Sequence, residues 1–172
     1  GIDFYLEEAI AILKKSGVDV RGETAYFDAD LILEYVAKAP SEFTQLARNP
    51  ENHLTIGGDR MVFAPVYGPP FVYDIQRGRR EARLVDFQNF VKLAYMSPYI
   101  HHSGGTIVEP TDEPDATRHL DMLFSHIKYS DKAFMGSVMS RANAQDSVRI
   151  AEILYGANEI RQNPALISLI NI

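Results

Sequence analysis

Apolar residues recur at helical spacing in the first part of the chain. They do so over residues 2–13, and Gly17 follows as a helix stop signal. A second helix is predicted over about residues 28–38, ended by Pro40. Residues 1–52 are therefore predicted to form an N-terminal helical segment.

Short strands separated by turn residues predict two β-hairpins in the next part of the chain. The first would join residues 53–57 to residues 60–64 across Gly58-Asp59. The second would join residues 71–75 to residues 81–84 around Gly78. Glycine and proline are concentrated here, which indicates a closely shaped backbone.

From about residue 84 onward, helical and strand patterns alternate. The predicted order is a helix ending before Pro98, a strand at 105–109, a helix opened by Asp115, a strand at 133–138, a helix at 142–155 and a strand at 165–171. Strands that alternate with helices predict βαβ units and a parallel sheet, and nearly continuous apolar strands are typical of sheets covered on both faces. No strand is followed by a nucleotide-binding glycine motif, which disfavours a dinucleotide fold.

The pattern favours an α/β fold of the (β/α)8 TIM barrel type. A complete barrel takes about 250 residues and eight strands. Counting residues 61–65 as the first strand gives about four strands. We therefore predict that residues 53–172 form the first half of a barrel, with the hairpins at its N-terminal end.

Composition narrows the classes of partner. The net charge of −6 argues against a nucleic-acid partner, and the longest apolar runs are too short to span a membrane. The chain has no cysteine, hence no disulfide, thiolate nucleophile or thiolate metal ligand. No signal peptide is evident, and we expect a cytoplasmic protein.

In a barrel, functional residues gather at the carboxyl ends of the strands, and this rule selects four positions. Tyr67 could contact substrate or pack on neighbouring prolines. Glu109 could act in the site, cap a helix or pair with an arginine. Ser137, like Ser140, could contact substrate or fill a tight turn. Asn171, a polar amide at the tip of an apolar strand, could contact substrate or cap a turn.

The histidines do not predict a metal site. His101 and His102 are adjacent, so their side chains point in different directions along an extended backbone. His119 and His126 could share a helical face, but no carboxylate completes a metal set. No spacing indicates a serine or cysteine hydrolase, and the catalytic residues are left unassigned.

Several runs in order along the chain resemble the trimethylamine methyltransferase family, whose corrinoid-dependent members demethylate trimethylamine or quaternary amines. They are Ala47-Arg48-Asn49-Pro50-Glu51-Asn52, Ile56-Gly57-Gly58-Asp59, Phe63-Ala64-Pro65, Tyr67-Gly68-Pro69-Pro70-Phe71, Asp86-Phe87, Asn89-Phe90-Val91-Lys92-Leu93-Ala94, His101-His102-Ser103-Gly104-Gly105, Thr117-Arg118-His119-Leu120-Asp121-Met122 and Met135-Gly136-Ser137-Val138. One departure is Arg83, where the family pattern suggests a threonine helix cap. The resemblance covers only the N-terminal part of such a barrel. Pyrrolysine-containing and pyrrolysine-free members both fit, because the position that separates them lies beyond residue 172.

The resemblance implies methyl transfer from a methylated amine, such as trimethylamine or glycine betaine, to the cobalt of a corrinoid. The corrinoid (cobalamin type) would be supplied by a cognate partner protein, so this chain would bind no cofactor itself. A quaternary amine leaves as a neutral tertiary amine, and the protein then positions the substrate and stabilises its charge. Tyr67, Phe71 and Tyr73 would offer aromatic faces to the ammonium, and Glu109 a counter-charge.

Three alternatives follow from the same residues. The 172-residue chain is expected to be inactive alone, as a fragment of the enzyme. It could instead be a non-catalytic module that binds quaternary amines through residues 67–73. An unrelated barrel acting on a phosphorylated sugar is a third reading. Half a barrel has open strand edges, so we expect a homo-oligomer.

Overall fold

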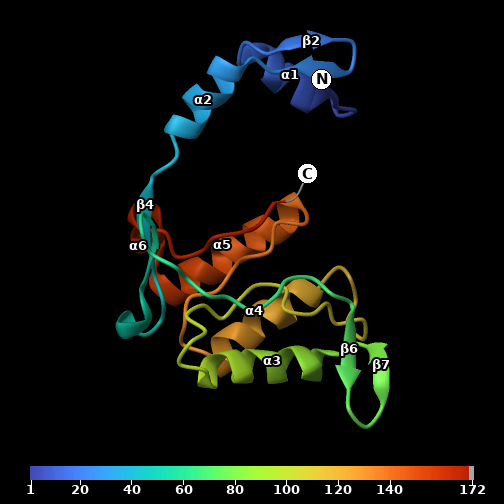
Figure 1. The fold of residues 1–172 in the computed structure, drawn as a ribbon, viewed down its shortest axis with the longest axis vertical. Coiled ribbons are helices and arrows are strands. Elements are labelled where there is room, and N and C mark those ends of the chain that lie inside the picture. The colour runs from blue at the N-terminus through green and yellow to red at the C-terminus, as the bar shows by residue number, and fades with distance from the viewer. Residues whose placement is uncertain (171–172) are drawn as a thin grey trace. The chain divides into compact units, whose positions relative to one another are not determined.

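The computed structural model describes residues 1–170 and divides into two compact units, Gly1–Ser41 and Glu42–Ile172 (Figure 1). The boundary lies before residue 42 rather than after the predicted residue 52. The physical reason is strand pairing: β4 (Glu42–Gln45) is antiparallel to β5 (Leu54–Gly57), which ties the residues between them to the second unit.

The first unit contains a small sheet as well as the predicted helices. Its elements are β1 (Ile2–Asp3), α1 (Glu7–Lys15), β2 (Asp19–Arg21), β3 (Thr24–Tyr26) and α2 (Ala29–Ala37). The sheet order is β1-β3-β2, all antiparallel. The prediction of a helix from residue 2 was wrong at its start, because Ile2 pairs with Ala25. Strands of two or three residues are too short to give an alternating pattern.

The second unit carries most of the chain. After β4 and β5 it contains η1 (Pro50–Asn52, which lies between them), β6 (Phe71–Asp74), β7 (Gly78–Glu81), α3 (Leu84–Met96), α4 (Arg118–Tyr129), α5 (Arg141–Tyr155) and α6 (Ala157–Gln162). The three long helices confirm the helical predictions after residue 84. The short α6 was not predicted. None of the described helices has the length and apolar character needed to cross a membrane.

Of the two predicted hairpins, the structure contains the second, but its return strand is Gly78–Glu81 rather than residues 81–84, because the turn is shorter than predicted. β6 pairs with β7, and the Asp74 carboxylate accepts hydrogen bonds from the backbone N–H groups of Gln76 and Arg77 in the turn. Gly78 has φ +71°, a conformation that suits glycine. The first predicted hairpin is wrong: β5 pairs with β4, and residues 60–64 form no strand.

The predicted barrel strands are extended segments rather than regular strands. Within residues 1–170, one isolated parallel bridge, Met135 to Ile167, joins two of them, and no closed barrel is formed. Backbone hydrogen bonds nevertheless place four segments side by side in chain order, residues 63–69, 101–109, 133–137 and 165–168. The bonds that establish this order run from His101 to Phe63, Gly68 to Thr106, Glu109 to Pro69, Ser103 to Ala133, Met135 to Gly104 and Gly136 to Ile167.

These contacts also give the direction of the segments. Along the first two neighbouring pairs, later residues of one segment bond to later residues of the other, as from His101 with Phe63 to Glu109 with Pro69, and the bridge between Met135 and Ile167 is parallel. The segments therefore run in the same direction, as in a parallel sheet. Their carboxyl ends lie at a common edge.

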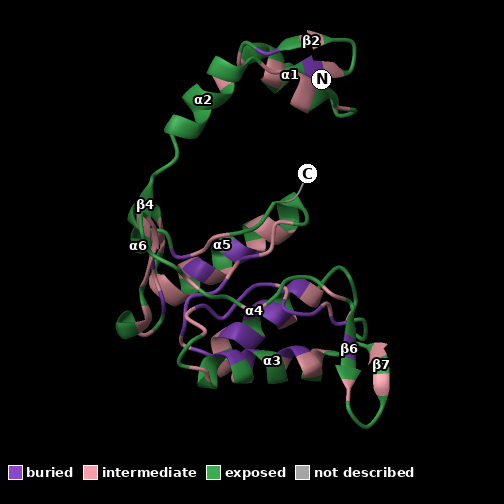
Figure 2. Cartoon of the chain, viewed as in Figure 1, coloured by how far each residue is buried: buried purple, intermediate pink, exposed green. Residues whose placement is uncertain are grey.

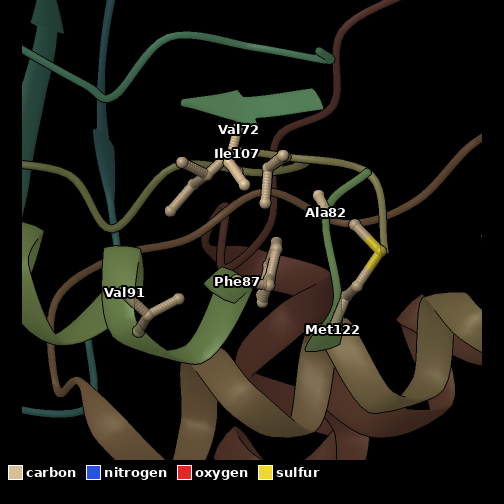
Figure 3. Close-up of a cluster of buried hydrophobic side chains, with 7 residues drawn as sticks. Val72, Ala82, Phe87, Val91, Ile107 and Met122 are labelled. Carbon is tan, nitrogen blue, oxygen red and sulfur yellow. The ribbon is translucent and has the colours of Figure 1, made fainter. Parts of the chain in front are cut away.

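The hydrophobic core of the second unit lies between α3, α4 and the segment 101–109. Phe87 and Val91 rise from α3 toward Ile107 and Val72, and Met122 approaches from α4 (Figure 3). Phe87 and Val91 are fully buried. The buried residues gather around these helices, whereas the surfaces of α1 and α2 are largely exposed (Figure 2).

Candidate functional site

The amino ends of the third and fourth extended segments are covered by residues 45–52. The backbone N–H of Leu46 donates to the Pro164 carbonyl (2.8 Å), and the Gln45 side-chain amide donates to the Phe134 carbonyl (3.0 Å). The amides of Asn49 and Asn52 both donate to the Asp131 carboxylate. The carboxyl ends are thus the ends left for a functional site, in agreement with the rule for barrels.

Tyr67 lies at one of these carboxyl ends and packs over a glycine. A Cβ atom added to Gly105 would lie 3.0 Å from a Tyr67 ring carbon and 3.0 Å from the Met135 Cβ. The next residue, Gly68, donates its N–H to the Thr106 carbonyl at 2.7 Å. The ring therefore crosses from the first segment over the second toward the third, and it is 37% exposed.

Phe71, at the start of β6, already has a cation on its ring. The Arg79 guanidinium carbon lies 3.7 Å from the ring centroid, across the β6–β7 hairpin. One aromatic face is thus occupied within the protein, and only the other could meet a substrate ammonium. Tyr73, two residues further along the strand, is 80% exposed.

Glu109 ends the second segment and forms an ion pair. Its backbone N–H donates to the Pro69 carbonyl (2.9 Å), and its carboxylate accepts from the Arg118 guanidinium at 2.7 Å. Arg118 also bonds to Asp115 and to the Glu113 carbonyl. The arginine partner that the sequence left open is present, and it reduces the negative charge that Glu109 offers.

Ser137 is held through its backbone by a serine of α5. The Ser147 hydroxyl accepts from the Ser137 N–H (2.9 Å) and lies 3.2 Å from its carbonyl oxygen. The Ser137 side chain has no hydrogen bond to other described residues. Ser140 instead caps α5, since its hydroxyl accepts from the Asn143 N–H at 3.1 Å.

The structure therefore brings three of the predicted site residues to neighbouring segment ends. Tyr67, Glu109 and Ser137 belong to the first, second and third segments, which run in the same direction. Phe71 lies just beyond the first segment, in a hairpin of its own. Asn171 lies outside the described residues.

Comparison with known proteins identifies the family. A family model described as trimethylamine methyltransferase matches residues 1–172. The chain belongs to this family. It is 48% identical to a glycine betaine methyltransferase from Desulfitobacterium hafniense (strain Y51) over 172 residues, 99% of this chain and 36% of that protein.

A second relative is more distant. The chain is 27% identical to a proline betaine:corrinoid methyltransferase from Eubacterium limosum, over 98% of this chain and 36% of that protein. The chain thus spans about a third of the length of these two relatives. Both relatives are named for transfer of methyl groups from betaines, which carry quaternary nitrogen.

The site of this family member offers an aromatic ring and a partly neutralised carboxylate. Those groups can hold and orient a cation. Within residues 1–170, no cluster of three or more histidine and acidic side chains is arranged to hold a metal ion.

Behind the site lies a buried polar group that the sequence did not reveal. The Ser103 hydroxyl and the Gly105 carbonyl bond to the two ring nitrogens of His126, which is 2% exposed. Burial lowers the pKa of His126 to about 4. Burial, and secondarily the nearby His126, lowers the pKa of His102 to about 4. Both rings are neutral at pH 7, and His126 joins α4 to the second segment, whereas His102 accepts a hydrogen bond from the Gly104 N–H within that segment.

One signal could have pointed to this group. His126 follows Met122 and Leu123 at helical spacing on the apolar face of α4, which indicated a buried histidine. The partner Ser103 could not be deduced, because it is 23 residues away in the chain. The arginine on Phe71 was equally hidden, since it depends on the strand register.

Proposed function

We propose that the full-length protein transfers a methyl group from a quaternary amine such as glycine betaine to the cobalt of a corrinoid carried by a partner protein. The family match and the 48% identity to a glycine betaine methyltransferase support this substrate class. The second relative, named as a corrinoid methyltransferase, supports the acceptor. Trimethylamine is the alternative substrate within the same family.

The observation that carries the proposal is the Tyr67 ring over Gly105 at the carboxyl ends of the segments. A quaternary ammonium cannot donate a hydrogen bond, so it is recognised through aromatic faces and through charge. Each face contributes about 0.5–2 kcal/mol, depending on how far the site excludes water. Glycine in place of a larger residue at position 105 is what lets the ring lie there.

The fold proposed for this activity is a (β/α)8 barrel of which this chain forms the first part. We assign the four extended segments to the first four strands, with α3, α4 and α5 as the helices that follow the first three. The chain-order neighbours and their common direction support this assignment. The cover formed by residues 45–52 would then close the amino end of the barrel.

In this mechanism the protein positions the substrate. The reduced cobalt supplies the nucleophile that accepts the methyl group, and the amine leaves with its electron pair as a neutral tertiary amine. No residue needs to protonate that nitrogen. Tyr67 would fix the methylated nitrogen, and Glu109, with its charge shared by Arg118, would add a weak attraction for cations.

The test is turnover by the full-length protein with its reduced corrinoid protein. Conversion of glycine betaine to dimethylglycine, followed by NMR and dependent on the corrinoid protein, is the expected result. No demethylation of glycine betaine, proline betaine, carnitine or trimethylamine would overturn the proposal.

A binding measurement on the 172-residue chain distinguishes the enzyme from the alternative, a non-catalytic module that binds quaternary amines. The chain covers 36% of each relative, and we propose that it is inactive by itself. Calorimetry on the 172-residue chain should detect no tight binding of betaine, because most of the pocket wall would come from other residues. Tight binding by this chain, without turnover by the full-length protein, would favour a binding module.

A further inference from the structure

A small cavity lies between α4 and the second and third extended segments. Its lining includes Gly105 and Thr106 from the second segment, Gly136 and Ser137 from the third, and His119 from α4. Its volume is about 10 Å³. That is close to the space of one water molecule and too small for a methylated amine or an oxyanion.

His119, which lines this cavity, has an unsatisfied ring nitrogen. The side chain is 7% exposed, and its Nε2 lies 3.2 Å from a carboxylate oxygen of Asp146 on α5. Its Nδ1 is buried and has no hydrogen-bond partner among residues 1–170. Leaving a buried polar atom unpaired costs about 1–3 kcal/mol, so such atoms are normally satisfied by protein or by bound water.

We propose that this cavity is a binding site for one water molecule, which donates a hydrogen bond to Nδ1 of His119. Asp146 accepts a hydrogen bond from Nε2–H in this tautomer, and Nδ1 is then the ring nitrogen that can accept one from a water. His126 also lines the cavity, but both of its nitrogens are bonded to protein. His119 is therefore the histidine that needs the water.

The other partners of the water are available in the same lining. Thr106 and Ser137 each bring a hydroxyl, and neither hydroxyl is bonded to another described residue. A buried water usually makes two to four hydrogen bonds. With Nδ1 and these hydroxyls as partners, the water would join α4 to the second and third segments.

This role differs from that of the candidate substrate site. The Asp146–His119–water chain links α5, α4 and the segment ends, so His119 is a positioning residue. The presence of this water does not depend on methyl transfer, because it is detected as bound water and not as turnover.

The first test is a high-resolution crystal structure of the full-length protein. We expect an ordered water about 2.7–3.2 Å from Nδ1 of His119. An ordered His119 with no water peak at Nδ1 would overturn the proposal. So would a flipped ring in which a protein group satisfies the second nitrogen.

A matched pair of variants provides the second test. The amide of His119→Asn takes roughly the place of Nδ1, and the amide of His119→Gln roughly the place of Nε2. We expect the water to stay in His119→Asn and to be lost in His119→Gln, which keeps the contact with Asp146. Equal water occupancy in the two variants, or loss in His119→Asn alone, would show that His119 does not hold it. Should neither variant fold, the wild-type structure still decides.

Discussion

The Ser103 hydroxyl lies 2.8 Å from Nδ1 of His126. Nε2 of the same ring lies 2.9 Å from the Gly105 carbonyl, so Nε2 carries the proton and Nδ1 accepts. The ring is packed between Phe87 and Phe134, at centroid distances of 5.2 and 5.7 Å. A neutral imidazole satisfies every partner in this arrangement, whereas a second proton on Nδ1 would require the Ser103 hydroxyl to turn from donor to acceptor and would place a charge among buried aromatic rings.

Acid should therefore begin to destabilise the protein at pH values well above the ordinary pKa range of carboxylates. The pKa of His126 falls from 6.5 to about 4 on folding, so the unfolded chain binds more protons between these values. The contribution of His126 to the free energy of unfolding is fully present above pH 6.5 and is lost as the pH drops toward 4. We expect a loss of about 2 kcal/mol per buried histidine between pH 7.5 and 5.0.

Denaturant unfolding at several pH values measures this effect. The pKa of the Asp86 carboxyl is lowered from 3.8 chiefly by the hydrogen bond from Arg80. This group therefore changes the free energy of unfolding only at pH values below the range from 7.5 to 5.0. A free energy of unfolding that stays constant from pH 7.5 to 5.0 would contradict the assignment of a buried neutral His126.

Lys132 is expected to be a strong determinant of stability. Its ammonium donates to the carbonyls of Ala94, Ser97 and Ile100 at 2.9, 2.9 and 2.6 Å. These carbonyls end α3 and the turn after it, and Lys132→Met would leave them unpaired. We expect a loss of about 2–4 kcal/mol.

The control for Lys132 is a lysine that is exposed on α4. Lys128→Met should change the unfolding free energy by less than about 0.5 kcal/mol. Chemical denaturation of both variants gives the comparison. Equal losses would mean that the three carbonyl contacts contribute little.

The elements that the sequence predicted are those governed by local patterns. The helices α3, α4 and α5 have apolar residues at helical spacing, and the β6–β7 turn is specified by Asp74 and Gly78. The first hairpin was mispaired because β5 pairs with β4, across a loop that contains η1, and Gly58-Asp59 resembled a hairpin turn. A local pattern does not reveal a partner across such a loop.

The irregular segments have a similar explanation. Side chains take carbonyls that a regular ladder would use: Gln45 bonds to the Phe134 carbonyl and His126 to that of Gly105. The strand-end rule still selected Tyr67, Glu109 and Ser137 on neighbouring segments. The partners of those residues, such as Arg118 and Ser147, lie on following helices and depend on packing that no single pattern encodes.

The 172-residue chain is expected to self-associate. The segment 165–168 bonds to the third segment on one side, and next to it Ile170 is 73% exposed. At the other edge Val66 is also 73% exposed. Exposed apolar edges pair with other chains. Light scattering should detect dimers or larger species, and Val66→Lys with Ile170→Lys should reduce them; a monomer at high concentration would contradict this.

Tyr67 is expected to contribute to binding through its ring rather than its hydroxyl. In the full-length protein, Tyr67→Phe should keep the affinity for glycine betaine within about threefold, because the aromatic face remains. Tyr67→Leu removes that face and should weaken binding about 3- to 30-fold. Calorimetry without the corrinoid protein measures both. A larger loss for Tyr67→Phe than for Tyr67→Leu would show that the hydroxyl is the contact.

Gly105 should matter for binding only through Tyr67. The added Cβ of Gly105→Ala would lie 3.0 Å from the ring and 3.0 Å from the Met135 Cβ, closer than such contacts normally are, so the ring must shift. We expect Gly105→Ala to weaken betaine binding about 3- to 30-fold in the full-length protein. In the Tyr67→Leu background the same change should have little further effect, because the face that it displaces is already gone. Additive losses of betaine affinity in this double-mutant cycle would mean that Gly105 affects binding by another route. The free energy of unfolding of Gly105→Ala, measured in parallel, shows whether a loss of affinity comes from a loss of folded protein.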